Sequence, residues 1–115
     1  MATNFSKKDM IKLQNLLRKS KKTITTAESC TGGLVASMIT KISGSSDIFN
    51  GSIVTYSNSI KNKELDVLNE SLDKFGAVSK QVVSEMLDGV LRKFEADFAI
   101  AISGIAGPNG GTKNK

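Results

Sequence analysis

Residues 22–33, KTITTAESCTGG, contain an abrupt change of local preference. The run from Thr23 to Thr26 is β-branched throughout, which favours a strand. Two glycines follow, and apolar residues then recur at helical spacing in LVASMITKI. The sequence therefore predicts a strand that turns directly into a helix, with a carboxylate, a hydroxyl and a thiol at the corner.

The same alternation of strand and helix extends along the whole chain. We predict helices over 6–19, 32–42 and 79–94, strands over 22–27, 51–58 and 97–104, a weak helix or irregular segment over 59–68, and a turn over 71–79 that Gly76 closes. Ser6 and Ser79 stand where N-caps are expected. Such alternation is typical of an α/β protein, here a three-layer α/β/α sandwich with a mainly parallel sheet, in one domain over 1–115.

Apolar stripes on the predicted helices define the expected core. They comprise Met10, Leu13, Leu16 and Leu17, then Leu34, Val35, Met38, Ile39 and Ile42, then Val82, Val83, Met86, Val90 and Leu91. The strand over 97–104 is apolar without interruption, which predicts a central strand covered on both faces.

Composition narrows the classes of function. The chain of 115 residues has no histidine, which removes the commonest general base and metal ligand, so no metal site is expected. A single cysteine, Cys30, excludes an internal disulfide and fits a reducing compartment, so we expect a cytoplasmic protein. No apolar run approaches the roughly 20 residues that span a membrane. The net charge of +5 comes from lysines clustered around the first helix, and aromatic residues are few, so no nucleic-acid partner is expected.

The carboxyl ends of parallel strands meet at one edge of a sheet, where ligands bind in α/β folds. The three predicted strands run into ESCTGG, YSNSIK and SGIAGPNGG at that edge. The first of these loops suits an anion at a helix N-terminus. It is equally explained by Thr31 capping the helix while the glycines make a tight turn.

Ser29 and Cys30 are the candidate nucleophiles. Without histidine, a base must be a lysine, a carboxylate or a tyrosinate. Lys61 follows the second strand and is the best-placed candidate, provided that burial lowers its pKa enough to leave a neutral fraction. Tyr56 and Asn58 lie near it and suit either ligand orientation or a plain turn.

Six motifs, TTAESCTGG, GSS, FxG, VTYSNxxK, GAVS and SGIAGPNGG, occur in the order and spacing of the CinA C-terminal family, which the chain resembles from about residue 13 to 112. The resemblance implies a nicotinamide-nucleotide amidase, which hydrolyses the carboxamide of nicotinamide mononucleotide to the acid and ammonia without a cofactor. It implies Ser29 as nucleophile, Lys61 as base and Tyr56 as helper. Substrate contacts are implied at Cys30, Thr31, Gly32, Gly33, Asn58, Ser103, Gly104, Ile105 and Gly107.

The end of the sequence departs from this pattern. Family members continue with further sheet, a basic phosphate-contacting segment and a final helix, so the resemblance implies a chain that lacks them. We therefore expect low activity unless a partner fragment or a homo-oligomer completes the fold. Two alternatives stay open: a nucleotide-binding module without turnover, and a competence- or DNA-damage-associated protein.

Overall fold

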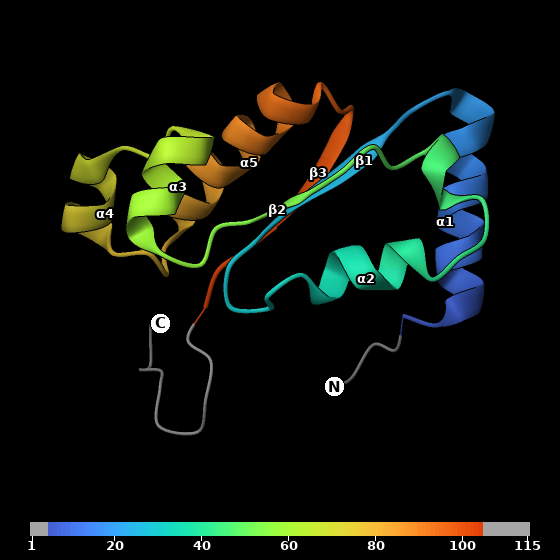
Figure 1. The fold of residues 1–115 in the computed structure, drawn as a ribbon, viewed down its shortest axis with the longest axis horizontal. Helices are drawn as coiled ribbons and strands as arrows, with labels where there is room; N and C mark the ends of the chain where they lie inside the picture. Colours follow the sequence, from blue (N-terminus) through green and yellow to red (C-terminus); the bar gives the residue numbers. More distant parts are fainter. Residues whose placement is uncertain (1–4, 105–115) are drawn as a thin grey trace.

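The computed structural model describes residues 5–104, and Figure 1 shows their arrangement. In chain order the elements are α1 (Lys7–Ser20), β1 (Ile24–Glu28), α2 (Leu34–Thr40), the short 3₁₀ helix η1 (Ser45–Asp47), β2 (Ile53–Val54), α3 (Asn58–Leu65), α4 (Asn69–Phe75), α5 (Lys80–Phe94) and β3 (Phe98–Ile102). Within this range, every helix is too short or too polar to cross a bilayer.

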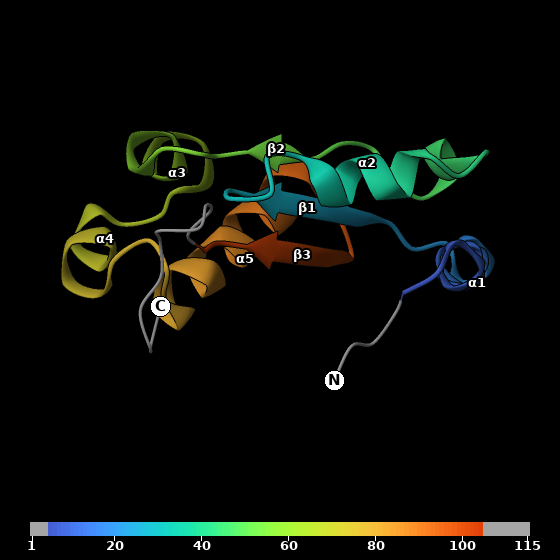
Figure 2. The same cartoon turned by 90° about the horizontal axis from the view of Figure 1, so that it is seen from below.

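The three strands form one parallel sheet in the order β2-β1-β3. Ile24 to Glu28 pair one by one with Phe98 to Ile102, whereas β2 contributes two pairs, beginning with Ala27 and Ile53. The strand arrows in Figure 2 accordingly point the same way. The predicted parallel arrangement is confirmed, and the three strands end at the same, carboxyl edge of the sheet.

Helices cover both faces of β1, which gives the predicted α/β/α layers. Ala27 points into a core made with α5, through Val82, Met86 and Val90. Ile24 points to the opposite face, into a second core that includes Ile39 of α2. Figure 1 shows α5 and α2 on opposite sides of the strands. Since residues alternate between faces along a strand, Thr26 and Glu28 share the α2 side with Ile24.

The two long helices begin as predicted. Ser6 and Asp9 form a reciprocal capping box at the start of α1. The Ser79 hydroxyl accepts a hydrogen bond from the Val82 backbone N–H at the start of α5. Helix α5 then packs very closely on α3, because a Cβ atom built on Gly89 would lie 2.1 Å from the Leu65 carbonyl oxygen.

The prediction of a turn over 71–79 is wrong for 71–75 and holds for 76–79, where the chain bends. Helix α4 occupies Asn69–Phe75, and Gly76 ends it by donating its N–H to the Leu72 carbonyl. At its N-terminus, the N-cap residue Leu68 supplies no side-chain hydrogen bond. Glu85 of α5 supplies one instead, accepting from the Leu68 N–H at 2.8 Å and from the Ser71 hydroxyl at 2.5 Å. A cap from a distant part of the chain leaves no local sequence signal.

Parts of the predicted core are also wrong. Leu16 and Leu34 are 60% and 58% exposed, and Met38 is exposed as well. The strand predicted to be central is at the edge of the described sheet, where β1 is its sheet neighbour. Phe98 and Ile100 are exposed on the α2 side of β3, because the main packing of α2 on the sheet is over β1.

Candidate active site

Ser29 and Lys61 meet at the carboxyl edge of the sheet. Ser29 follows β1 directly, is 6% exposed, and donates its backbone N–H to the Ile102 carbonyl at the end of β3. Lys61 comes from α3 and is 1% exposed. Its Nζ atom lies 3.0 Å from the Ser29 Oγ. A candidate nucleophile and a candidate base are thus in direct hydrogen-bond contact.

The other partners of Lys61 are neutral. Its Nζ donates to the Thr55 carbonyl at 2.8 Å and to the Tyr56 carbonyl at 3.3 Å. Burial lowers the pKa of Lys61, and the nearby Cys30 partly opposes this by raising it. Among residues 5–104 no carboxylate is bonded to the Lys61 amine, so no paired anion offsets the effect of burial on its pKa.

Three neighbours suit a neutral amine. A neutral lysine has two N–H bonds and one lone pair. The two carbonyls take the two N–H bonds, which leaves the lone pair to accept the Ser29 hydroxyl proton. In the charged form Lys61 donates to the Ser29 hydroxyl oxygen, and in the neutral form it accepts the Ser29 hydroxyl proton. Only the neutral form can activate the serine.

Helix α3 is fixed at both ends, which holds Lys61 in place. The Ser57 hydroxyl caps its N-terminus by accepting from the Ile60 N–H. At the other end Leu65, one helical turn after Lys61, is 1% exposed and packs in the α5 core.

Glu28 is a buried acidic residue at this corner, and the sequence pattern indicated no role for it. It is the last residue of β1 and is 0% exposed. Burial alone raises the pKa of its carboxyl, but hydrogen bonds from Thr31, Val35, Ala36 and Thr26 outweigh that effect and lower the pKa below the ordinary value. Its place between a β-branched strand and a glycine turn was the available signal.

The N-terminus of α2 holds this carboxylate. Gly33 is the N-cap, with φ of 103° and no side-chain bond, and Glu28 accepts from the Val35 and Ala36 N–H groups. The glycines make the tight turn that one alternative predicted, with the Gly32 N–H donating to the Ser29 carbonyl. However, Thr31 does not cap the helix, because its hydroxyl donates to Glu28. Two donors that an external anion would need are therefore occupied.

Of the remaining predicted site residues, some lie at this corner and others make different contacts or are exposed. Cys30 is half-buried beside Gly104, where an added Cβ would lie 3.2 Å from the cysteine sulfur. Ser103 donates its hydroxyl to the Ala77 carbonyl at 2.8 Å. Tyr56 contacts Lys61 through its carbonyl, while its side chain is 69% exposed. Asn58, the first residue of α3, is also exposed, and Ile105 and Gly107 lie outside the described residues.

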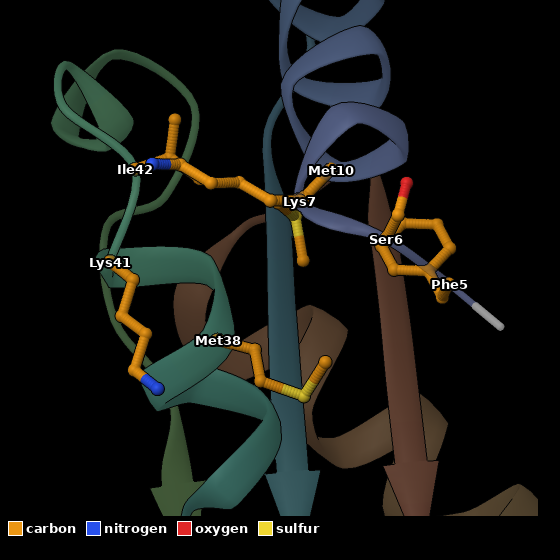
Figure 3. Close-up of a pocket in the computed structure, with 7 residues that line it drawn as sticks. All are labelled: Phe5, Ser6, Lys7, Met10, Met38, Lys41 and Ile42. Carbon is orange, nitrogen blue, oxygen red and sulfur yellow. The ribbon is translucent and has the colours of Figure 1, made fainter.

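A separate hollow of about 440 Å³ lies between the N-terminus of α1 and the C-terminus of α2. Met10 and Met38 are among its lining residues, and Figure 3 shows their side chains between the two helices. None of its lining residues belongs to the predicted site. Within residues 5–104, no cluster of three cysteine or carboxylate side chains could hold a metal ion.

Comparison with known proteins gives consistent matches. Residues 7–115 match the family model of the CinA C-terminal domain. A CinA-like protein of Prochlorococcus marinus is 62% identical over 99 residues, which are 86% of this chain and 23% of that protein. One of Thermotoga neapolitana is 51% identical over 87% of this chain and 24% of its own length. The chain thus spans about a quarter of these relatives.

Solved structures agree. The competence/damage inducible protein CihA of Agrobacterium tumefaciens is 39% identical, with a TM-score of 0.91 over 100% of this chain and 70% of that one. A CinA superfamily protein of Escherichia coli is 35% identical, with a TM-score of 0.89 over 96% of this chain and 65% of that one. These matches confirm the family resemblance that the motifs indicated and the α/β fold class that the alternation of strands and helices predicted.

Proposed function

Because this chain belongs to the CinA C-terminal domain family, we propose that it carries the Ser–Lys site of an amidohydrolase that acts on nicotinamide mononucleotide. The single observation that carries the proposal is the contact of 3.0 Å between the Lys61 Nζ and the Ser29 Oγ, in a buried site whose other acceptors are neutral. The substrate class comes from the family resemblance.

The proposed reaction begins with Lys61 neutral. Its lone pair takes the Ser29 hydroxyl proton as the Ser29 oxygen attacks the carboxamide carbon. The resulting ammonium returns the proton to the departing nitrogen, and ammonia leaves. Water then attacks the acyl-serine ester while Lys61 accepts a proton from it. The resulting ammonium gives this proton to the Ser29 oxygen as the ester bond breaks. The products are nicotinic acid mononucleotide and free Ser29, so the lysine ends in its starting state.

The tetrahedral intermediate carries an oxyanion that needs N–H donors. Of the corner residues, Gly32 already donates its N–H to the Ser29 carbonyl. The N–H groups of Cys30, Thr31 and Gly33 have no acceptor within residues 5–104. We assign the oxyanion to the Cys30 N–H, next to the nucleophile, where one donor contributes about 3 to 4 kcal/mol in comparable sites.

Tyr56 and the glycine-rich corners complete the proposed site. The exposed Tyr56 phenol suits contact with the bound nucleotide better than proton exchange with Lys61, because its carbonyl makes the contact with the lysine. Cys30 and Gly104 lie close together at this corner and are proposed to contact the substrate.

Ammonia release from nicotinamide mononucleotide tests the proposal. We expect low but measurable turnover by the unaltered chain, as the resemblance implies, and none by Ser29→Ala or Lys61→Met. Lys63→Met, an exposed lysine on the same helix, and Ser84→Ala, an exposed serine on α5, are the matched controls and retain turnover. Full activity of Ser29→Ala would refute the assignment.

Calorimetry with the same nucleotide separates the alternatives. Binding without ammonia release would identify a binding module that lacks turnover.

A further inference from the structure

We propose that Glu28 is the positioning residue of this site: its buried carboxylate ties the first turn of α2 to the end of β1 and so presents Ser29 to Lys61. This role rests on the proposed function, in that Ser29 is taken as the nucleophile. Glu28 itself touches neither the Ser29 hydroxyl nor Lys61, so it acts through the backbone.

Each carboxylate oxygen of Glu28 faces one backbone N–H and one threonine hydroxyl. The Oε1 atom accepts from the Val35 N–H at 2.9 Å and from the Thr31 hydroxyl at 2.7 Å. The Oε2 atom accepts from the Ala36 N–H at 2.8 Å and from the Thr26 hydroxyl at 2.9 Å. All four donors are neutral, and together they satisfy a carboxylate that no water reaches.

These bonds enclose the nucleophile in a short loop. Glu28 precedes Ser29 directly, and Thr31, two residues after Ser29, is bonded back to the Glu28 carboxylate. Inside this loop the Gly32 N–H is bonded to the Ser29 carbonyl. The backbone on both sides of Ser29 is therefore held against β1, which fixes the direction of the hydroxyl.

The arrangement also keeps the two buried ionisable groups apart. A carboxylate bonded to Lys61 would stabilise the ammonium and disfavour the neutral amine that the mechanism needs. The acceptors of Lys61 are the Ser29 hydroxyl and two carbonyls. Both oxygens of Glu28 accept from other donors. Glu28 can thus anchor the corner without holding the lysine protonated.

Glutamine cannot replace this carboxylate. Because each oxygen faces a backbone N–H, the NH₂ group that Glu28→Gln introduces would oppose either the Val35 or the Ala36 N–H, whichever way the amide turns. Glu85 offers a matched control, since it caps α4 from a distance in a similar way. Its Oε2 atom faces a hydroxyl and a glutamine amide, both of which can turn to accept.

The test measures the reactivity of Ser29 in the whole 115-residue chain. A fluorophosphonate probe is attacked at phosphorus by the Ser29 oxygen, fluoride leaves, and the hydroxyl proton passes to Lys61. Mass spectrometry then reports the rate constant and the final labelled fraction. For Glu28→Gln we expect the rate constant to fall on the order of 100-fold, as expected for a displacement of about 1 Å. For Glu85→Gln we expect an unchanged rate constant.

The rate constant separates positioning from simple destabilisation. A merely structural loss lowers the labelled fraction in step with the unfolded fraction, and leaves the rate constant of folded molecules unchanged. Equal rate constants for Glu28→Gln and the unaltered chain would overturn the proposal, as would an equal slowing by Glu85→Gln. If Glu28→Gln does not fold, Thr26→Val removes one of the four bonds, and the proposal then requires about a tenfold slowing.

The same experiment distinguishes this role from the proposed activity. Labelling of Ser29 without ammonia release would refute the amidase activity. The labelling rate constants of Glu28→Gln and the unaltered chain would still test the positioning role of Glu28. Ammonia release with equal labelling rates would sustain the amidase and overturn the role of Glu28. An unaltered chain that is not labelled at Ser29 would overturn both.

Discussion

Gly89→Ala should both destabilise the fold and separate Lys61 from Ser29. Gly89 lies in α5 at its contact with α3, and its added methyl carbon would lie 2.1 Å from the Leu65 carbonyl oxygen. A methyl carbon and a carbonyl oxygen approach to about 3.3 Å, so α3 must move away by about 1 Å. The obstacle is backbone, and no side-chain rotation relieves it.

Two terms set the magnitude of the change in stability. Overpacking of this severity costs about 3 kcal/mol. The gain in helix propensity from glycine to alanine offsets about 1 kcal/mol. The expected net loss is about 2 kcal/mol, or a melting temperature lower by about 8 °C in a chain of this size.

The displacement also reaches the site, because Lys61 lies one turn before Leu65 on α3. Movement of about 1 Å stretches the contact of 3.0 Å between Nζ and Oγ beyond hydrogen-bond range. We expect Ser29 labelling of the folded variant to slow on the order of 100-fold. Urea unfolding and fluorophosphonate labelling of Gly89→Ala, with Ser84→Ala on the same helix as control, measure both effects. A variant as stable and as reactive as the unaltered chain would refute the reasoning.

Three further perturbations test other contacts. The labelling rate of Ser29 should rise with pH to a plateau, with a midpoint below the ordinary lysine pKa of about 10.4, because the neutral form of Lys61 is the base. Between the lowered pKa of Lys61 in the folded chain and its ordinary pKa in the unfolded chain, the unfolded chain binds more protons. As pH rises through this range, the free energy of unfolding of the unaltered chain should therefore increase relative to that of Lys61→Met. A difference that stays constant in urea unfolding at several pH values would contradict this. Ser79→Ala should lower the free energy of unfolding by about 1 kcal/mol through loss of the α5 cap, against no change for Ser84→Ala. The pKa of Glu28 is lowered in the folded chain, so its carboxylate stabilises the fold above its unfolded pKa and stops doing so as pH falls through the folded pKa. The difference in free energy of unfolding between the unaltered chain and Glu28→Gln should therefore disappear in acid. A difference that persists in acid would contradict this.

Local signals predicted the main elements of the fold. The caps at Ser6 and Ser79 and the β-branched run before Glu28 depend on neighbours in sequence, and these predictions are confirmed. Helix α4 was missed because its cap comes from Glu85, 17 residues after the Leu68 N–H that it accepts from. The exposure of Leu16 and Phe98 depends on which element packs where, and periodicity alone does not contain that information.

The sequence predicted which residues meet at the candidate site, but not what surrounds them. The absence of histidine left Lys61 as the best-placed base, and the structure brings it to Ser29. The neutral surroundings of Lys61 could not be predicted, because they are backbone carbonyls that any residue would supply. The hydrogen bonds of Glu28 could not be predicted for a similar reason. Two of its four donors are backbone N–H groups of a helix that begins six residues later.

The pairing of β1 with β3 also decides when a newly made chain can become reactive. The hydrogen bond from the Thr23 N–H to Asp97 joins residues 74 positions apart. The hydrogen bond from the Ser29 N–H cannot form until its acceptor, the Ile102 carbonyl, has been synthesised. At a synthesis rate of about 5 to 20 residues per second, Ser29 exists for roughly 4 to 15 s before its backbone partner is made. During translation the serine therefore lacks the strand that orients it, and a competent nucleophile arises late, together with the completed sheet.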